Sequence, residues 1–252
     1  MGSGLIGQQR RSRVMRERWE EGHDATRRYK ERVARSITPG MRILHAGCGW
    51  DKTDVSRRYI NDCEVVGIDL DSRVAALFHS EFHLGALTSM PFEADSFDVI
   101  LCEYVVEHLD DPETAFREME RVLRPGGRML FLTPNLYSYK AIAAACASQR
   151  FHTLVGRIRY GVEHERDMYP TLYRCNTVAQ FRRLASKAGL QIVTTDFVTN
   201  GPTWFEKVPI VFEIFDVFHR AIASSNTLRH LRCALILELR KPVRGVATAR
   251  EV

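Results

Sequence analysis

Paired cysteines and long apolar runs are both missing from this chain. Its six cysteines form no C-x-x-C pair, and several lie inside apparent strands, as Cys102 does, which indicates reduced core thiols rather than a disulfide framework. No apolar run reaches the roughly 18 residues that a membrane span needs, and the arginine-rich N-terminus has no apolar signal-peptide core. We therefore expect a cytoplasmic protein, with peripheral membrane contact left open.

Two phosphate-binding patterns are also missing from the glycine-rich turn that follows the apolar run 41–46. In G-x-G-x-x-G the third glycine allows close helix packing beside a pyrophosphate, but the sixth residue counted from Gly47 is Lys52. The G-x-x-x-x-G-K-[ST] loop of NTPases is absent as well. These absences argue against a dinucleotide site and against an NTPase, and the short loop suits an adenosine without phosphates.

The stretch Met41–Asp71 does contain the parts of an adenosine half-site. Gly47 and Gly49 let the backbone turn tightly, so that a ligand can approach main-chain N–H groups without meeting a Cβ atom. Asp69 closes the next apolar run, 20 residues beyond Gly49. At that distance a βαβ unit presents a carboxylate to the hydroxyls of a ribose.

With these residues the chain resembles the small-molecule branch of the class I S-adenosylmethionine-dependent methyltransferases, a methyltransferase type 11-like pattern. The resemblance continues through GALTSMPFEADSFDVILCEYVVEHLDDP and FREMERVLRPGGRMLFLTPN, and it covers roughly residues 38–135 in a fixed motif order. It implies S-adenosylmethionine as the cofactor. It also implies an α/β fold: a Rossmann-like, seven-stranded, mostly parallel and doubly wound sheet that ends in an antiparallel hairpin.

Apolar runs alternate with amphipathic segments in a βαβ rhythm, which predicts a parallel sheet with helices on both faces. Strands are predicted at 41–46, 64–69, 82–87, 97–103 and 128–133, with later ones at 191–198 and 233–239. Helices are predicted at 53–60, 72–79, 112–123, 137–148 and 177–188.

The chain is long and apolar enough, at 252 residues with 45% hydrophobic ones, to bury one α/β domain with additions. The expected parts are a basic helical arm (1–37), a methyltransferase domain (38–242) and a tail (243–252). Within the domain we expect a lid or substrate segment near 149–176 and an aromatic helical segment near 202–228.

The net charge of +5 is concentrated in the arm, whose apolar residues recur at helical spacing. These apolar residues are Val14, Trp19, Tyr29 and Val33. The pattern favours a packing helix with a solvated basic face over a nucleic-acid surface. The resemblance adds a third interpretation, in which the arm closes over the cofactor pocket.

Ligands of open parallel sheets bind beyond the carboxyl ends of the strands, so the residues that follow each strand are the candidates. The resemblance places an adenine-contacting pair at Ala86 and Leu87. The full set of predicted cofactor-binding residues is His45, Gly47, Cys48, Gly49, Asp51, Asp69, Leu70, Ala86, Leu87 and Glu103.

Three of these positions depart from the family pattern. His45 stands where an acid commonly holds the cofactor's ammonium group, Asp51 replaces the last glycine of the loop, and Ala86 replaces an acid that pairs with the adenine amino group. Losing one charge-assisted hydrogen bond costs on the order of 1.5 to 3 kcal/mol. Asp51 could supply a displaced carboxylate or cap the next helix, and the residues leave both roles open.

Methyl transfer from a sulfonium is an in-line displacement, which needs a base only when the acceptor carries a proton of high pKa. His108, after the fourth strand, is the candidate base, and Glu107 is a second candidate. For both, a structural role near the helix that starts at Asp111 is the alternative. No oxygen-rich cluster for a metal is evident, so we expect metal independence.

The segment from Tyr160 to Asn176 interrupts the βαβ rhythm and is rich in polar aromatic and basic residues. This composition favours a lid that recognises a small-molecule acceptor, and an ordinary surface connection is the alternative. The candidate substrate residues are Tyr104, His164, Tyr169, Tyr173 and Arg174.

Apolar and aromatic residues recur at helical spacing between Pro202 and Ala223. Such a face most often packs against a sheet, but it could line an apolar acceptor pocket, pair two protomers in a homodimer, or lie at a membrane interface.

The sequence thus predicts methyl transfer to an oxygen or nitrogen atom of a small metabolite, with a hydrophobic or lipid-linked acceptor as one option. A non-catalytic module with the same fold would fit the three departures. A nucleic-acid methyltransferase fits less well, because the fourth strand is followed by CEYV and not by an N/D-P-P-Y/F loop.

Overall fold

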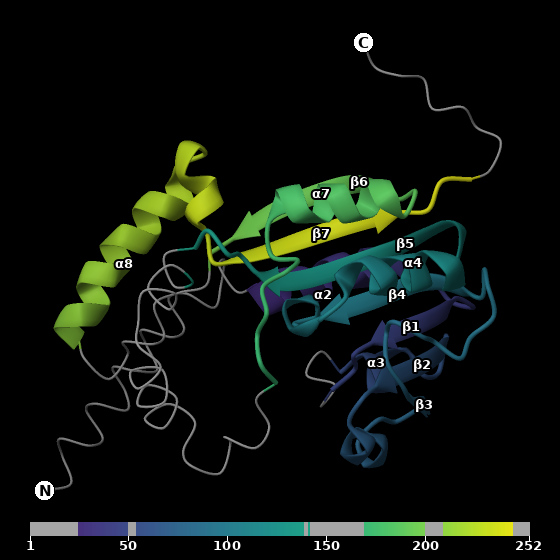
Figure 1. Ribbon diagram of the computed structural model, residues 1–252. Helices are drawn as coiled ribbons and strands as arrows, with labels where there is room; N and C mark the ends of the chain where they lie inside the picture. Colours follow the sequence, from purple (N-terminus) through teal and green to yellow (C-terminus); the bar gives the residue numbers. More distant parts are fainter. Residues whose placement is uncertain (1–24, 50–53, 139–140, 142–168, 200–208, 244–252) are drawn as a thin grey trace, which may run out of the picture. The chain divides into compact units, whose positions relative to one another are not determined.

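A seven-stranded sheet runs through the described part of the chain, which in this computed structural model comprises residues 25–49, 54–138, 141, 169–199 and 209–243 (Figure 1). The strands are β1 (Arg42–Ala46), β2 (Glu64–Asp69), β3 (Glu81–Leu84), β4 (Phe97–Glu103), β5 (Leu123–Pro134), β6 (Gln191–Val198) and β7 (Ala234–Arg240). Their order in the sheet is β3-β2-β1-β4-β5-β7-β6.

The first five strands pair in parallel, and β7 runs against β5. The amide of Asn135 donates to the carbonyl of Cys233 at one end of this antiparallel pair, and the amide of Lys241 donates to the carbonyl of Gly127 at the other. The predicted seven-stranded, mostly parallel fold with an antiparallel end is therefore confirmed.

Helices cover both faces of the sheet, with α4 and α7 on one face and α2 on the other (Figure 1). The described α-helices are α2 (Ala25–Ser36), α3 (Val55–Tyr59), α4 (Pro112–Val122), α7 (Val178–Lys187) and α8 (Pro209–Ser224). The described 3₁₀ helices are η1 (Ser72–Ala76), η2 (Val106–His108) and η5 (Thr227–Leu231). In α2, Tyr29 and Val33 are buried, and the Tyr29 hydroxyl donates to the carbonyl of Leu130 at 3.0 Å, so this part of the arm is a packing helix.

Polar side chains fix the starts of α4 and α7. Asp111 caps α4 by accepting a 3.0 Å hydrogen bond from the amide of Thr114, and Pro112 follows as the first helical residue. Thr177 and Gln180 form a reciprocal capping box at the start of α7. These caps determine where the segments before each helix must lie.

An aromatic cluster packs α4 and α7 against β5. The ring of Phe116 stacks on Phe131 with centroids 5.5 Å apart, and both meet Phe181 edge-on at 5.7 and 5.3 Å. All three side chains are fully buried. Burying rings of this size contributes much of the core's stability.

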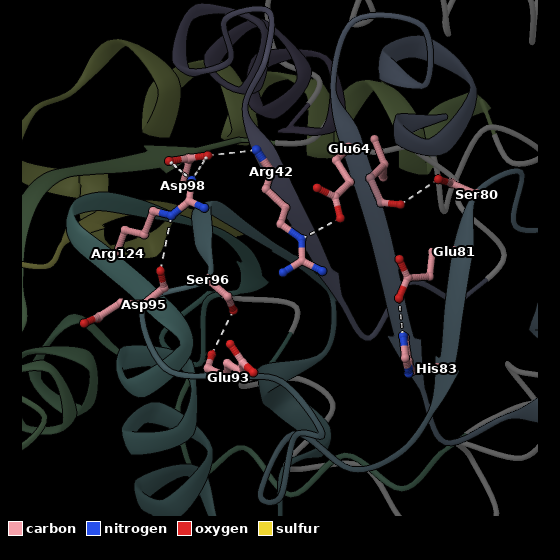
Figure 2. A network of polar contacts seen from close by, with 11 residues as sticks. Arg42, Glu64, Ser80, Glu81, His83, Glu93, Asp95, Ser96, Asp98 and Arg124 are labelled. Atoms are coloured by element: carbon pink, nitrogen blue, oxygen red, sulfur yellow. Dashed lines mark hydrogen bonds and ion pairs between the residues drawn. The ribbon is translucent and has the colours of Figure 1, made fainter.

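Charged side chains pair with one another near the amino ends of the strands (Figure 2). Arg42 of β1 contacts Glu64 of β2 at 2.7 Å, and its amide donates to Asp98 of β4. Asp98 in turn pairs with Arg124 at 2.8 Å. These side chains hold neighbouring strands together, and the predicted site residues Asp69 and Glu103 lie at the opposite, carboxyl ends of β2 and β4.

The chain divides into two compact units. One comprises Tyr29–Thr133, Pro170–Asp196 and Ile236–Val252, and the other comprises Met1–Arg28, Pro134–Tyr169 and Phe197–Leu235. The predicted domain boundaries at 37 and 242 stay predictions.

The second unit contains α8, whose burial pattern is unusual for an amphipathic helix. Asp216 and His219 are buried, whereas Ile214 and Val217 are 65% and 68% exposed. The described part of the predicted aromatic segment therefore leaves apolar side chains at the surface, and the remainder of that segment, 202–208, lies outside the described residues.

Two element predictions around β3 are wrong. The helix predicted at 72–79 is a 3₁₀ helix that ends at Ala76, closed by a hydrogen bond from the amide of Leu77 to the carbonyl of Val74. The strand predicted at 82–87 ends at Leu84, because residues 86–89 form a turn that is closed by the amide of Ser89 on the carbonyl of Ala86.

The fifth strand is longer than the predicted 128–133. It starts at Leu123, which pairs with Phe97, and the register shifts before Arg128 pairs with Val99. Gly126, at φ +85°, accommodates this irregularity. The helix predicted at 53–60 is confirmed over Val55–Tyr59, and the one predicted at 137–148 falls mostly on residues outside the described part.

Candidate functional site

Both glycines in the turn after β1 have a positive φ, and they differ in what a Cβ atom would meet. Gly47 has φ +69°, and a Cβ there would lie 2.4 Å from a methyl carbon of Val105. Gly49 has φ +47°, and a Cβ there would meet nothing within 4 Å, so the loop borders open space. The amide of Gly47 donates to the carbonyl of Ile68 at 2.8 Å, which holds the turn against the end of β2.

Asp69, the last residue of β2, faces this turn. Its Oδ2 accepts a 2.8 Å hydrogen bond from the amide of Gly49, and its Oδ1 accepts one of 3.0 Å from the amide of Asp71. Two main-chain donors thus fix the carboxylate, and each oxygen has a further lone pair for a ligand hydroxyl. The structure brings Asp69 and Gly49 together as the sequence predicts.

Apolar side chains flank Asp69. Leu70 follows Asp69 and is 65% exposed. Leu84, which is the register partner of Asp69 on β3, is 61% exposed. The sequence reasoning missed Leu84, because it placed this residue in the middle of a longer strand. Exposed leucines beside a carboxylate form a surface suited to a flat apolar ring next to a polar sugar.

His45 and Cys48 are buried. His45 belongs to β1, which pairs with β2 and β4. The centroid of its ring is 6.2 Å from that of the Phe78 ring. A Cβ on Gly67 would meet Phe78 at 2.7 Å and the sulfur of Cys48 at 3.0 Å, so this packing is close. Their predicted contacts with a cofactor stay predictions.

Asp51 lies outside the described residues. The N-cap position of α3 is occupied by Asp54, whose side chain makes no capping hydrogen bond. Both roles predicted for Asp51 stay predictions.

Ala86 and Leu87 lie in the turn after β3. The amide of Gly85 donates to the carbonyl of Asp69 at 2.9 Å, which brings this turn beside the carboxylate. Leu87 is buried and Ala86 is partly exposed. Their predicted contacts with an adenine ring stay predictions.

The chain turns sharply where β4 ends. Glu103 is the last residue of the strand, and Tyr104 adopts φ +53°, an uncommon conformation for a residue with a side chain. The amide of Tyr104 still donates to the carbonyl of Leu132 at 2.8 Å. The turn places η2, with Glu107 and His108, directly after the sheet edge.

Glu107 points inward. Its side chain is 3% exposed, and its Oε2 accepts a 3.1 Å hydrogen bond from the hydroxyl of Thr133. Burial raises the pKa of Glu107 to about 7, against the opposing effect of its hydrogen bonds. The carboxyl is therefore partly protonated near neutral pH.

The ring of His108 is oriented by a main-chain carbonyl. Its Nδ1 lies 3.0 Å from the carbonyl oxygen of Pro170. A carbonyl can only accept, so Nδ1 carries the proton, and in the neutral ring Nε2 holds the lone pair. Nε2 is thus the nitrogen that can act as a base.

The described end of the predicted lid, residues 170–176, lies against the loop after β4. The amides of Leu172 and Tyr173 both donate to the carbonyl of Glu107, at 2.7 and 3.1 Å. Arg174 pairs with Asp110 at 2.6 Å. The structure therefore brings Tyr173 and Arg174 beside the candidate base, with the Arg174 guanidinium engaged by a carboxylate.

Two other predicted substrate residues lie in or before this segment. Tyr169 is half exposed, and His164 lies outside the described residues. Thr133 and Asn176 were missed, although Thr133 belongs to the motif LTPN at the end of β5 and could have been inspected as a residue at the ligand edge.

Within the described ranges, no three His, Cys, Asp or Glu side chains are grouped so that they could hold a metal ion. Metal independence stays a prediction. None of the five described cysteines takes part in a disulfide. No helix in the described part of the chain is long and apolar enough to span a bilayer.

Part of this chain is similar to known methyltransferases. Residues 44–131 match the model of the methyltransferase domain family Methyltransf_11. The uncharacterized methyltransferase YcgJ of Bacillus subtilis is 35% identical over 102 residues, which are 36% of this chain and 40% of that protein. Phosphoethanolamine N-methyltransferase 1 of Arabidopsis thaliana is 31% identical over 118 residues, 43% of this chain and 24% of that protein.

The matching segment thus spans less than half the length of these curated relatives. Among solved structures, the [4+2]-cyclase SpnF is similar with a TM-score of 0.57 at 20% identity, covering 86% of this chain and 81% of that one. At this identity the likeness shows the shared fold.

Proposed function

We propose that the protein is a class I S-adenosylmethionine-dependent methyltransferase that transfers a methyl group from this cofactor to an oxygen or nitrogen atom of a small metabolite, and the match of residues 44–131 to the methyltransferase domain model supports this. The observation that carries this proposal is the Asp69 carboxylate, held by the amide of Gly49 at the carboxyl edge of the sheet.

The residues at this edge fit the cofactor. Asp69 accepts from the ribose hydroxyls, and the exposed Leu70 and Leu84 contact the adenine ring. The turn lets the methionine portion approach the main chain at Gly49, where a Cβ would meet nothing within 4 Å, whereas at Gly47 that space is already filled by Val105. Bound there, the cofactor supplies an electrophilic methyl group on a sulfonium.

His108 acts on the acceptor. With Nδ1 held by the carbonyl of Pro170, its Nε2 removes the proton from an acceptor hydroxyl or amine as the new bond to carbon forms. Segment 170–176 orients the acceptor and excludes water, with Tyr104, Tyr173 and Arg174 as contacts. No metal is needed for this step.

For the acceptor we favour an apolar or lipid-linked metabolite, because α8 exposes Ile214, Val217 and Phe218. A cytoplasmic location, a homodimer and peripheral membrane contact also remain part of the proposal. Nucleic acid is the least favoured acceptor, since the end of β4 carries Glu103 and Tyr104 where an N/D-P-P-Y/F loop would be needed.

One observation favours a second candidate, a non-catalytic module. His45 is a buried histidine where the family commonly has an acid for the cofactor's ammonium group. A fold of this kind can also serve other chemistry, since fold alone does not fix function.

Calorimetry with S-adenosylmethionine tests the proposal. We expect binding by the wild-type protein, and a loss of about 10- to 100-fold in affinity for Asp69→Ala, since charge-assisted hydrogen bonds are worth about 1.5 to 3 kcal/mol. Glu81→Ala, which removes an acid near the amino edge of the sheet, is the matched control and should bind as the wild type does.

Methyl transfer is then tested with cofactor labelled in the methyl group and a fractionated extract of small molecules. Label should move into a low-molecular-weight fraction, and His108→Gln should slow the transfer without changing cofactor affinity. Tight cofactor binding with no transfer to any fraction would favour the non-catalytic module.

A further inference from the structure

A directed chain of hydrogen bonds links the end of β5 to segment 170–176. The hydroxyl of Thr133 donates to Oε2 of Glu107 at 3.1 Å and accepts from Nδ2 of Asn176 at 2.7 Å. A hydroxyl has one proton, so these two bonds fix its direction. All three side chains are at most 3% exposed, which means that water cannot replace a lost partner without cost.

Glu107 also holds the segment through its main chain. Its carbonyl accepts from the amides of Leu172 and Tyr173. Just beyond Asn176, the capping box of Thr177 and Gln180 anchors the same segment to α7. Residues 170–176 are therefore attached to the loop after β4 at several neighbouring points.

Pro170, at the start of this segment, contacts the candidate base His108. Pro170 provides the carbonyl that orients His108, but proline has no amide hydrogen of its own with which to be held in place. Its position is therefore influenced by the hydrogen bonds of the residues that follow it. Of these, Leu172, Tyr173 and Asn176 are attached to Glu107, Asn176 by way of Thr133.

We propose that Glu107 is a positioning residue, which fastens segment 170–176 so that the carbonyl of Pro170 keeps Nδ1 of His108 protonated and leaves Nε2 as the basic nitrogen. The proposal rests on the proposed function, in which His108 is the base. It replaces a direct catalytic role for Glu107, whose buried carboxyl is directed at Thr133 and not at the surface.

The surroundings of Glu107 agree with a neutral, structural carboxyl. The neighbouring thiols, Cys102 of β4 and Cys175 of the segment, are buried, and burial raises the pKa of both. The charged pair Asp110 and Arg174 lies at the exposed side of the same loop. While it is protonated, the carboxyl can accept from Thr133 without bringing an unpaired charge into the core.

The experiment compares Thr133→Val, which keeps the shape and removes the hydroxyl, with Thr133→Ser, which keeps the hydroxyl. Long-range proton–nitrogen NMR of the full chain reports which nitrogen of His108 is protonated, and His108→Gln identifies its signals. Amide exchange at Leu172 and Tyr173 reports how firmly the segment is held. Calorimetry with S-adenosylmethionine serves as the parallel measurement.

We expect the wild type and Thr133→Ser to show His108 protonated at Nδ1. In Thr133→Val the ratio of the two tautomers should shift about 10-fold toward Nε2–H, with a similar acceleration of exchange at Leu172, the factor that corresponds to about 1.4 kcal/mol. Glu107→Gln, whose amide oxygen still accepts from Thr133, should behave as the wild type does.

An unchanged tautomer in Thr133→Val, or a wild-type ring protonated at Nε2, overturns the proposal. Failure of the proposed function would look different: S-adenosylmethionine would not bind, or Asp69→Ala would bind it normally, whatever the tautomer of His108. Cofactor affinity in Thr133→Val should stay within about twofold of the wild type, since the hydrogen-bond chain does not include Asp69 or the glycine turn.

Discussion

Replacing Glu107 by glutamine should stabilise the protein at alkaline pH and not at acidic pH. The native pKa of this carboxyl is about 7, above its ordinary value of 4.5, because the side chain is buried. The native state therefore holds a proton that the unfolded chain releases between these two values. Stability conferred by the neutral carboxyl is complete below about pH 4.5 and is lost as the pH rises toward 7.

The size of this loss follows from the two pKa values. Each pH unit between 4.5 and about 7 is worth about 1.36 kcal/mol, which gives a total of about 3 kcal/mol. Glutamine is close to glutamate in shape, does not ionise, and can still accept the hydrogen bond from Thr133. The unfolding free energy of Glu107→Gln relative to the wild type should thus rise by about 3 kcal/mol from pH 4.5 to pH 8.

Urea unfolding at several pH values between 4.5 and 8 measures this difference. Glu113→Gln is the control, because the ion pair with Lys187 lowers the pKa of Glu113 and its stabilising effect disappears as the pH falls. That variant should therefore show no gain at pH 8. If the difference between Glu107→Gln and the wild type does not change with pH, the carboxyl does not titrate as its burial requires and the reasoning fails.

Two further substitutions test the glycine turn and the core. Gly47→Ala should weaken S-adenosylmethionine binding at least 10-fold in calorimetry, because its Cβ would lie 2.4 Å from Val105. The control Gly40→Ala, whose Cβ would meet nothing within 4 Å, should bind the cofactor normally. Equal affinities of the two variants would show that the turn tolerates a Cβ. Phe116→Ala should lower the unfolding free energy by about 3 to 5 kcal/mol in urea, since its buried ring stacks on Phe131, and a loss below about 1 kcal/mol would contradict the packing described.

The carboxyl edge of the sheet was predictable because its signals are local. Glycines at 47 and 49 and an acid at 69 report a tight turn and a strand end directly, and the structure joins Gly49 to Asp69 by a hydrogen bond. The strand boundaries of β2 and β4 follow from apolar runs that end in an acid. Short-range patterns of this kind need no knowledge of tertiary packing.

What escaped prediction depends on contacts between distant residues. The end of β3 is followed by a bond from the amide of Gly85 to the carbonyl of Asp69, and the early start of β5 is set by pairing with Phe97, and no local pattern reveals either contact. The inward direction of Glu107 is set by Thr133, 26 residues away in the sequence. A sequence pattern could nominate Glu107 and His108 together, but only the fold shows that one is buried and the other is held by Pro170.

The most direct measurement of the central claim is a crystal structure of the protein with S-adenosylhomocysteine. Both ribose hydroxyls should lie within about 3.2 Å of the Asp69 carboxylate, with the amino-acid portion over the turn at Gly47 and Gly49. A nucleoside bound elsewhere, with Asp69 still bonded only to the amides of Gly49 and Asp71, would contradict it.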